Sequence, residues 1–202
     1  MSATAYNAVT DLLDRNVDQG RGDKPAYIDP ARTLTYGALQ NETRRLANLL
    51  KRLQVRREER VGMIMLDTVE FPVVFLGAIR AGVVPVPLNT LLTADQYAYM
   101  LADSRARVLF VSAALLPMVE PILARLTDLQ HVLVVGGNGH AHTDFATALK
   151  AEADRFETVA AHRDEPAFWL YSSGSTGAPK GVRHVHGSLM ATADTYARQV
   201  LG

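Results

Sequence analysis

The sequence predicts an α/β fold in which layers of parallel β-sheet are flanked by helices. Short apolar runs of strand type alternate with helical segments along most of the 202 residues, and this alternation is typical of a parallel sheet with helices on both faces. Hydrophobic residues make up 48% of the chain, enough to bury a substantial core. The expected strands are residues 61–66, 83–86, 107–111, 131–135 and 168–172.

The remaining elements follow in order from turn and capping signals. A hairpin is expected first, with strands 26–29 and 32–35 around Asp29-Pro30. Leucines near one face predict a helix over residues 36–53. Capping and breaking residues then mark further helices. These run from Pro72 to Arg80 (ended by Gly82), from the N-cap Thr93 to Asp103, over 113–126 with Pro117 in the first turn, over 145–153, and over 189–201 with Ser188 as cap.

Charge and composition exclude several classes of protein. The formal net charge is zero, so nothing favours nucleic acid or an acidic membrane as partner. The chain has no cysteine, which excludes disulfides, thiolate catalysis and cysteine metal sites and suits a reducing cytoplasm. Asp11 and Asp14 interrupt any secretory signal, and Arg80 with two prolines breaks the most apolar stretch, so no membrane span is expected.

The segment from Tyr171 to Gly181 carries most of the functional information. The segment contains four Ser or Thr hydroxyls, three glycines and Lys180, and it follows an apolar run that includes Trp169. Glycines allow backbone N–H groups to form a concave anion-binding nest, while hydroxyls and a lysine add donors and positive charge. Pro179 before Lys180 and Gly181 after it exclude a Walker A loop. A flexible Gly/Ser linker is the alternative interpretation.

This segment resembles the phosphate-binding signature of the adenylate-forming enzymes, the acyl-CoA synthetase and adenylation-domain superfamily. Residues 34–39 resemble the first core motif of that superfamily, and residues 76–82, continuing to Val86-Pro87, resemble the second. The sequence is also similar to the benzoate–CoA ligase branch. The segments that carry this second resemblance are residues 65–68, 89–93, 99–104 and 167–177.

The resemblance implies an N-terminal part of the large domain of a ligase that converts benzoate or a hydroxybenzoate, with ATP, Mg²⁺ and CoA, into an acyl-CoA. Lys180 is expected to pair with the β- and γ-phosphates. Residues 1–202 are expected to form a partial N-terminal domain, inactive alone, because the catalytic residues and the adenine, ribose and Mg²⁺ motifs lie beyond Gly202 in the family. Whether the protein forms a homodimer is left open. The implied ATP-binding residues are Ser172, Ser173, Gly174, Ser175, Thr176, Gly177 and Lys180.

Two alternatives remain at this point. The chain can belong to a ligase for another carboxylic acid, or it can be a non-catalytic phosphate-binding module. The hydroxyls of the phosphate segment can also cap local turns instead of binding phosphate.

Other polar and aromatic residues are assigned structural roles or left open. His184 and His186 are placed on one side of a strand, where a structural hydrogen bond is favoured over metal ligation, and no metal ligand is predicted. Trp169 is expected in the core. Asp67 either faces a ligand at the carboxyl edge of the sheet or caps the next helix. Exposed positions in a polar turn are expected for His140 and His142.

Overall fold

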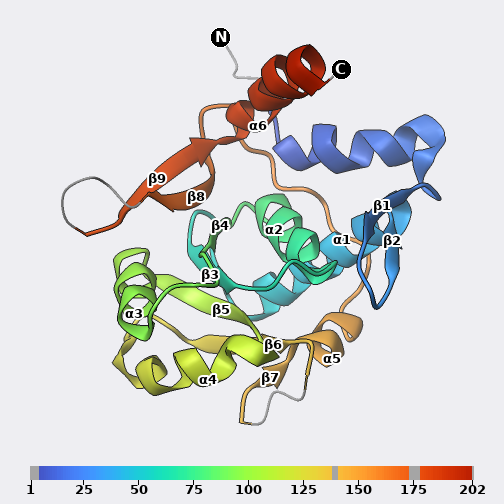
Figure 1. Cartoon of the computed structure of the whole chain (residues 1–202). Coiled ribbons are helices and arrows are strands. Elements are labelled where there is room, and N and C mark those ends of the chain that lie inside the picture. Colours follow the sequence, from blue (N-terminus) through green and yellow to red (C-terminus); the bar gives the residue numbers. More distant parts are fainter. Residues whose placement is uncertain (1–4, 138–140, 173–177, 202) are drawn as a thin grey trace.

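A parallel sheet of five strands lies at the centre of the molecule (Figure 1). The computed structural model describes residues 5–137, 141–172 and 178–201. The strand order is β4-β3-β5-β6-β7, and every neighbouring pair is parallel, as predicted. The strands are β3 (Arg60–Ile64), β4 (Val84–Pro87), β5 (Ala106–Ser112), β6 (His131–Val135) and β7 (Thr143–Asp144), of which β7 was not predicted.

Both faces of the central strands are buried, which explains why β3, β5 and β6 are mainly apolar. Val108 and Phe110 of β5 face a core that α1 and α2 close, whereas Leu109 and Val111 face a second core that α3 and α4 close. Figure 1 shows α1 and α2 on one side of the sheet and α3 and α4 on the other. All four of these β5 side chains are fully buried.

Side-chain caps fix the start of several helices. The Thr35 hydroxyl accepts the N–H of Ala38 at the start of α1. Thr93 and Gln96 form the capping box of α3, which confirms the predicted N-cap. The helices on the sheet are α1 (Tyr36–Arg52), α2 (Glu70–Arg80), α3 (Ala94–Asp103), α4 (Leu116–Val119) and α5 (Phe145–Lys150).

Two predicted helices are shorter than expected. The segment 113–126 divides into η3 (Ala113–Leu115, 3₁₀), α4 and η4 (Glu120–Arg125, 3₁₀). Pro121 lacks the N–H that would continue the α-helix. The helix predicted over 145–153 ends at Lys150, and beyond it the Asn48 side-chain amide donates to the carbonyls of Ala153 and Arg155.

The N-terminal part adds elements that the sequence did not reveal. Two π-helical turns, η1 (Thr10–Asp14) and η2 (Val17–Arg21), precede the predicted hairpin of β1 (Pro25–Ile28) and β2 (Thr33–Thr35). None of the helices that the structure describes combines the length and the apolar character that a membrane-crossing helix needs.

A buried ion pair joins this N-terminal part to the sheet helices. Arg80, 1% exposed, donates two hydrogen bonds to the Asp14 carboxylate, at 2.7 and 3.1 Å. It also donates to the hydroxyls of Thr43 and Thr158. Gln40 donates to Asp14 as well. Because η1, α1, α2 and the segment before β8 each supply a partner, the network fixes their relative positions.

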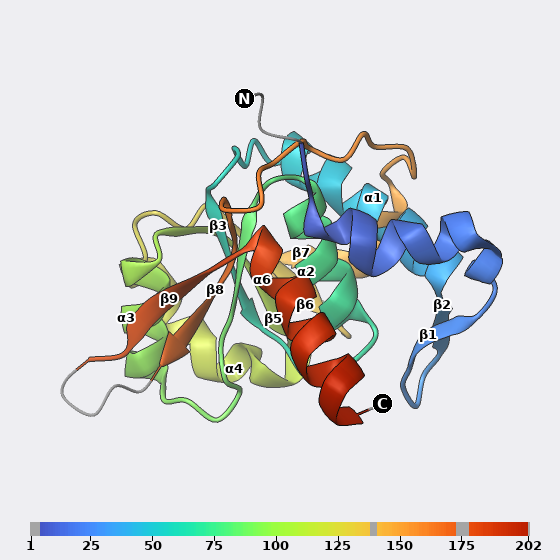
Figure 2. The ribbon, with the colours of Figure 1, turned by 90° about the horizontal axis from the view of Figure 1, so that it is seen from above.

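The C-terminal part is an antiparallel hairpin followed by a helix. β8 (Pro166–Ser172) pairs with β9 (Lys180–Val185), and α6 (His186–Thr192) continues into the π-helical η5 (Ala193–Leu201). In Figures 1 and 2 the hairpin lies beside α3. The predicted cap Ser188 is wrong: the helix follows Val185, and the Ser188 hydroxyl donates to the Val185 carbonyl because it lies inside the first turn.

Candidate phosphate-binding site

The two ends of the predicted phosphate segment lie opposite each other. Ser172 and Lys180 form the last residue pair of the β8–β9 ladder, and both are exposed. The segment therefore connects two antiparallel strands. The other predicted site residues lie outside the described part of the chain. These are Ser173, Gly174, Ser175, Thr176 and Gly177.

A cavity of about 590 Å³ borders this pair of strands. It lies where β3 and β4 end, which is the edge of a parallel sheet at which ligands usually bind. Ser172 and Pro179 bring the start and the end of the phosphate segment to its wall. Apolar side chains supply most of the rest, among them Met65, Phe71, Leu88, Leu92, Met100 and Leu170.

Asp67 is part of the same wall. Its side chain is exposed and lines the cavity. The capping interpretation is wrong, because α2 starts after Val69 without a side-chain cap. The N–H of Val69 is instead bound by the Asp29 carboxylate at 2.9 Å, and this hydrogen bond is the main reason why the pKa of Asp29 is lowered.

Tyr171, directly before Ser172, is tied to α3. Its hydroxyl donates to Asp103 Oδ2 at 2.6 Å, and the Met100 carbonyl lies 3.2 Å from the same hydroxyl oxygen as a second possible acceptor. Burial, reinforced by the Asp103 carboxylate, raises the pKa of the Tyr171 phenol. The phenol therefore stays protonated and remains a donor. The sequence analysis assigns Tyr171 no role, although its position directly before the Ser and Thr hydroxyls was a signal that could have singled it out.

Trp169 packs against the core beneath β8. It is part-buried and contacts the cluster that α3 and α4 close, in agreement with the expected core position. The Arg60 guanidinium lies over the indole, 5.5 Å from the ring centroid. The indole Nε1 is buried without a hydrogen-bond partner among the described residues.

The two histidines after the segment do not share one side of a strand. His184 lies in β9 and stacks on Phe168 with centroids 4.5 Å apart. His186 begins α6 and is 2% exposed, and its Nδ1 accepts the N–H of Ala8 at 3.1 Å. Burial lowers the pKa of His186, so the ring is neutral and serves as an acceptor. The strand placement is wrong for His186 because the helix starts there, but the structural hydrogen bond is confirmed.

His142 is not simply exposed. Its Nε2 lies 2.9 Å from Glu120, and its side chain is 19% exposed. His140 lies outside the described residues. In the parts of the chain that the structure describes, no group of three or more His, Asp or Glu side chains could hold a metal ion.

A larger hollow of about 770 Å³ lies elsewhere, between α1, the turn before β3 and the segment 155–159. It contains none of the predicted site residues. We therefore regard the smaller cavity, which the phosphate segment borders, as the candidate site.

The five-stranded parallel sheet and the β8–β9 hairpin form an adenylate-forming type of domain. The chain belongs to the family of AMP-binding enzymes, whose match extends over residues 13–201. It is 47% identical over 195 residues to a 4-hydroxybenzoate–CoA/benzoate–CoA ligase of Rhodopseudomonas palustris, and 46% identical over 198 residues to a benzoate–CoA ligase of Thauera aromatica. These matches cover 96% and 98% of this chain.

A solved structure shares the fold closely. The anthranilate–CoA ligase AuaEII in complex with anthranoyl-AMP matches 97% of this chain with a TM-score of 0.93 and 38% identity. The chain nevertheless spans only 36–37% of the length of the two ligases named above and 38% of AuaEII.

Proposed function

We propose that this chain forms the phosphate-binding part of a ligase that joins an aromatic carboxylate, benzoate or a hydroxybenzoate, to CoA with ATP. One observation carries the proposal: Ser172 and Lys180 face each other at the two ends of the glycine- and hydroxyl-rich segment, beside the cavity at the carboxyl edge of the sheet. The aromatic substrate is supported by the similarity to ligases named for benzoate and 4-hydroxybenzoate.

The reaction has two steps. The carboxylate oxygen attacks the α-phosphorus of ATP, pyrophosphate leaves, and an acyl-adenylate forms. The thiol of CoA then attacks the acyl carbon, AMP leaves, and the thiol proton passes to a base. Negative charge builds up on the phosphates during the first step, so preorganised donors aimed at them lower its barrier.

Particular residues take these roles in the proposal. Lys180 offsets charge on the β- and γ-phosphates, and Ser172 donates its hydroxyl at the start of the segment. From sequence alone, Ser173, Ser175 and Thr176 supply further hydroxyls, while Gly174 and Gly177 allow backbone N–H groups to turn toward phosphate. The described residues offer no metal cluster, so Mg²⁺ is assigned no ligand here.

The wider assignments are part of the same proposal. Residues 1–202 correspond to a partial N-terminal domain, and the cysteine-free composition suits the cytoplasm. The alternatives are a ligase for another carboxylic acid and a non-catalytic phosphate-binding module. In a protein of full family length, exchange of pyrophosphate into ATP that depends on benzoate separates these: dependence on a different acid supports the first alternative, and no exchange with any acid supports the second.

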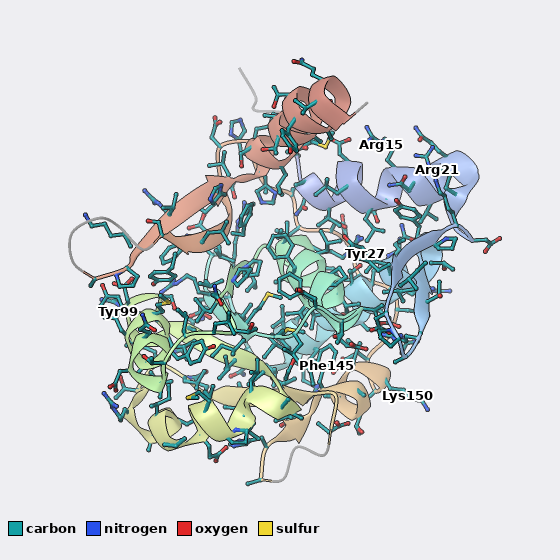
Figure 3. All side chains as sticks on the ribbon, in the orientation of Figure 1. Arg15, Arg21, Tyr27, Tyr99, Phe145 and Lys150 are labelled. Atoms are coloured by element: carbon teal, nitrogen blue, oxygen red, sulfur yellow. The ribbon has the colours of Figure 1, made fainter. Side chains whose placement is uncertain are left out.

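A titration of this chain with ATP tests the phosphate assignment. We expect the amide resonances of Ser172 and Lys180 to shift on addition of ATP, and Lys180→Ala to abolish most of the shift. Lys150→Ala, at the end of α5 and far from the hairpin in Figure 3, is the matched control and should behave as wild type. Equal losses in both variants would show that the response is non-specific charge binding.

A further inference from the structure

We propose that Tyr171 and Asp103 are positioning residues for the phosphate segment, acting through a hydrogen bond that holds the end of β8 on α3. The proposal rests on the phosphate-binding function proposed above. Neither residue is assigned contact with ATP: they fix the strand ends from which the phosphate segment starts.

The contact itself is strong. The Tyr171 hydroxyl donates to a carboxylate oxygen of Asp103 at 2.6 Å, a short, charge-assisted hydrogen bond. The Met100 carbonyl, 3.2 Å away, is a second acceptor for the same hydroxyl. Because burial raises the pKa of the phenol, the donor proton stays in place over the whole neutral range.

One hydroxyl fixes both ends of the phosphate segment. Tyr171 directly precedes Ser172, and its partner in the ladder is Gly181, which directly follows Lys180. The Tyr171 ring also packs closely on Gly181: a Cβ added there would lie 3.4 Å from Cζ of the ring. A shift of Tyr171 away from α3 would therefore move Ser172 and Lys180 together.

The same face of β8 is anchored once more, further from the segment. Trp169, two residues earlier, lies on the same side of the strand as Tyr171. Arg60 covers its ring and donates to the carbonyl of Ser104, at the end of α3. Trp169 therefore holds the middle of β8 independently of the Tyr171 hydrogen bond. Loss of the Tyr171 hydroxyl should loosen only the end of the strand that carries Ser172.

The anchor also belongs to the cavity wall. Met100 and Tyr171 both line the cavity beside Ser172, and Gln96 lies one turn earlier on α3. Since α3 is a rigid helix with a capping box, it fixes the distance between the cavity and the phosphate segment. The hydrogen bond therefore keeps a ligand in the cavity aligned with the donors that hold its phosphates. Without it, these donors would have to be ordered when the ligand binds, and that cost would lower the binding affinity.

The test measures binding of two probes, ATP and inorganic tripolyphosphate, to this chain by NMR titration. Tyr171→Phe should bind both about fivefold more weakly, because it keeps the ring and loses one hydrogen bond to a charged group. Asp103→Ala should show the same loss, whereas Asp103→Asn, which keeps an acceptor oxygen, should bind close to wild type. Tyr27→Phe, on β1 at the other side of the molecule, is the matched control (Figure 3).

A double-mutant cycle separates positioning from general stability. The variant with both Tyr171→Phe and Asp103→Ala should bind no more weakly than either single variant, because both remove one contact. Urea unfolding of Tyr171→Phe should show a folded chain at the temperature of the titration.

Three outcomes would overturn the proposal. The first is wild-type affinity in Tyr171→Phe, and the second is additive losses of affinity in the double variant. The third is a loss of affinity that is fully explained by the fraction of unfolded chain. Each would exclude the positioning role and leave the proposed function intact. If the wild-type chain bound neither probe, the proposed phosphate site itself would be wrong, and the positioning role with it.

Discussion

At the scale of single residues, burial decides which charged groups matter most for stability. Arg80 is 1% exposed and shares the Asp14 carboxylate with Gln40. Arg32 also forms ion pairs, with Glu42 and Glu70, but its side chain is 39% exposed. A buried pair costs desolvation when it forms, yet removing one partner leaves an uncompensated buried charge. Exposed pairs carry no such penalty.

Replacement of Arg80 by Ala should therefore lower the free energy of unfolding by about 3–5 kcal/mol, because the Asp14 carboxylate loses its partner. The matched variant Arg32→Ala should cost at most about 1 kcal/mol. Urea unfolding followed by circular dichroism measures both. Similar losses in the two variants would mean that water reaches Asp14 freely enough to replace the guanidinium.

The histidine at the start of α6 should make stability depend on pH. Burial lowers the pKa of His186, while the Glu165 carboxylate acts in the opposite direction and Arg57 adds to the lowering. In the unfolded chain the ring takes up its proton near pH ~6.5. As the pH falls below that value, the unfolded state binds a proton that the folded state does not bind. The free energy of unfolding therefore decreases between pH ~6.5 and the lower pKa of His186 in the folded state.

Unfolding midpoints between pH 7.5 and pH 5 should accordingly fall more steeply for wild type than for His186→Asn. Asparagine keeps an acceptor oxygen near the position of Nδ1, which takes the Ala8 N–H, but it does not titrate. His131→Asn is the control for the loss of one histidine elsewhere. Parallel pH profiles for wild type and His186→Asn would show that another group causes the dependence.

At the candidate site, the contacts between residues far apart in the sequence could not be predicted. The glycine- and hydroxyl-rich composition pointed to the segment after β8, and the position of Asp67 at a strand end pointed to the cavity edge. The hydrogen bond between Tyr171 and Asp103 joins residues 68 positions apart. It depends on how the hairpin docks on α3, and no local pattern encodes that docking.

At the scale of elements, the hydrophobic pattern predicted the buried central strands but did not predict the exposed strand β9. The central strands were predictable because both of their faces are covered, which demands continuous apolar runs. β9 was not assigned as a full strand, because its first four residues are exposed and carry no alternation. The break in the segment 113–126 could have been expected from Pro121, which removes an N–H inside the proposed helix.

The crossing of α1 and α2 gives an element-scale prediction. A Cβ at Gly77 would lie 2.5 Å from Leu46 Cδ2 and 2.8 Å from Leu46 Cβ, too close for either atom. Gly77→Ala should destabilise the chain by about 1–3 kcal/mol from overpacking, partly offset by the helix preference of alanine, which is worth about 1 kcal/mol.

The control for this prediction is Gly22→Ala. There an added Cβ meets only Val17 Cγ1, at an ordinary 3.9 Å, and φ is −53°. Its unfolding free energy should stay close to wild type or rise slightly. A stabilised Gly77→Ala variant would show that the two helices can separate without loss of packing.

At the scale of the whole molecule, the cavity that Ser172 and Pro179 line lies at the carboxyl edge of the sheet, while the larger hollow borders the turn before β3 and the end of α2. The fold class followed from sequence because alternation of strands and helices leaves few topologies. The docking of the β8–β9 hairpin beside α3 did not follow, since β8 and β9 form a separate two-stranded sheet and no ladder to the parallel sheet fixes its position.

The last prediction concerns what this chain does alone. It spans 36–37% of the length of the two aromatic acid–CoA ligases that it resembles. The proposal places only phosphate donors in it, and these must compete with water and salt. We expect ATP to bind in the millimolar range, about −4 kcal/mol, and we expect no benzoyl-CoA from benzoate, ATP and CoA.

The measurement is chromatographic detection of benzoyl-CoA, with the chain omitted as the blank and a complete benzoate–CoA ligase as the positive control. Lys180→Ala should weaken ATP binding and leave product formation at the blank level, because there is no activity to lose. Benzoyl-CoA above the blank from wild type would contradict the proposal that this chain supplies only phosphate donors. It would place the acyl pocket, the nucleotide site and the thiol-transfer step within these residues, with the cavity beside Ser172 as the place to look for the bound acid.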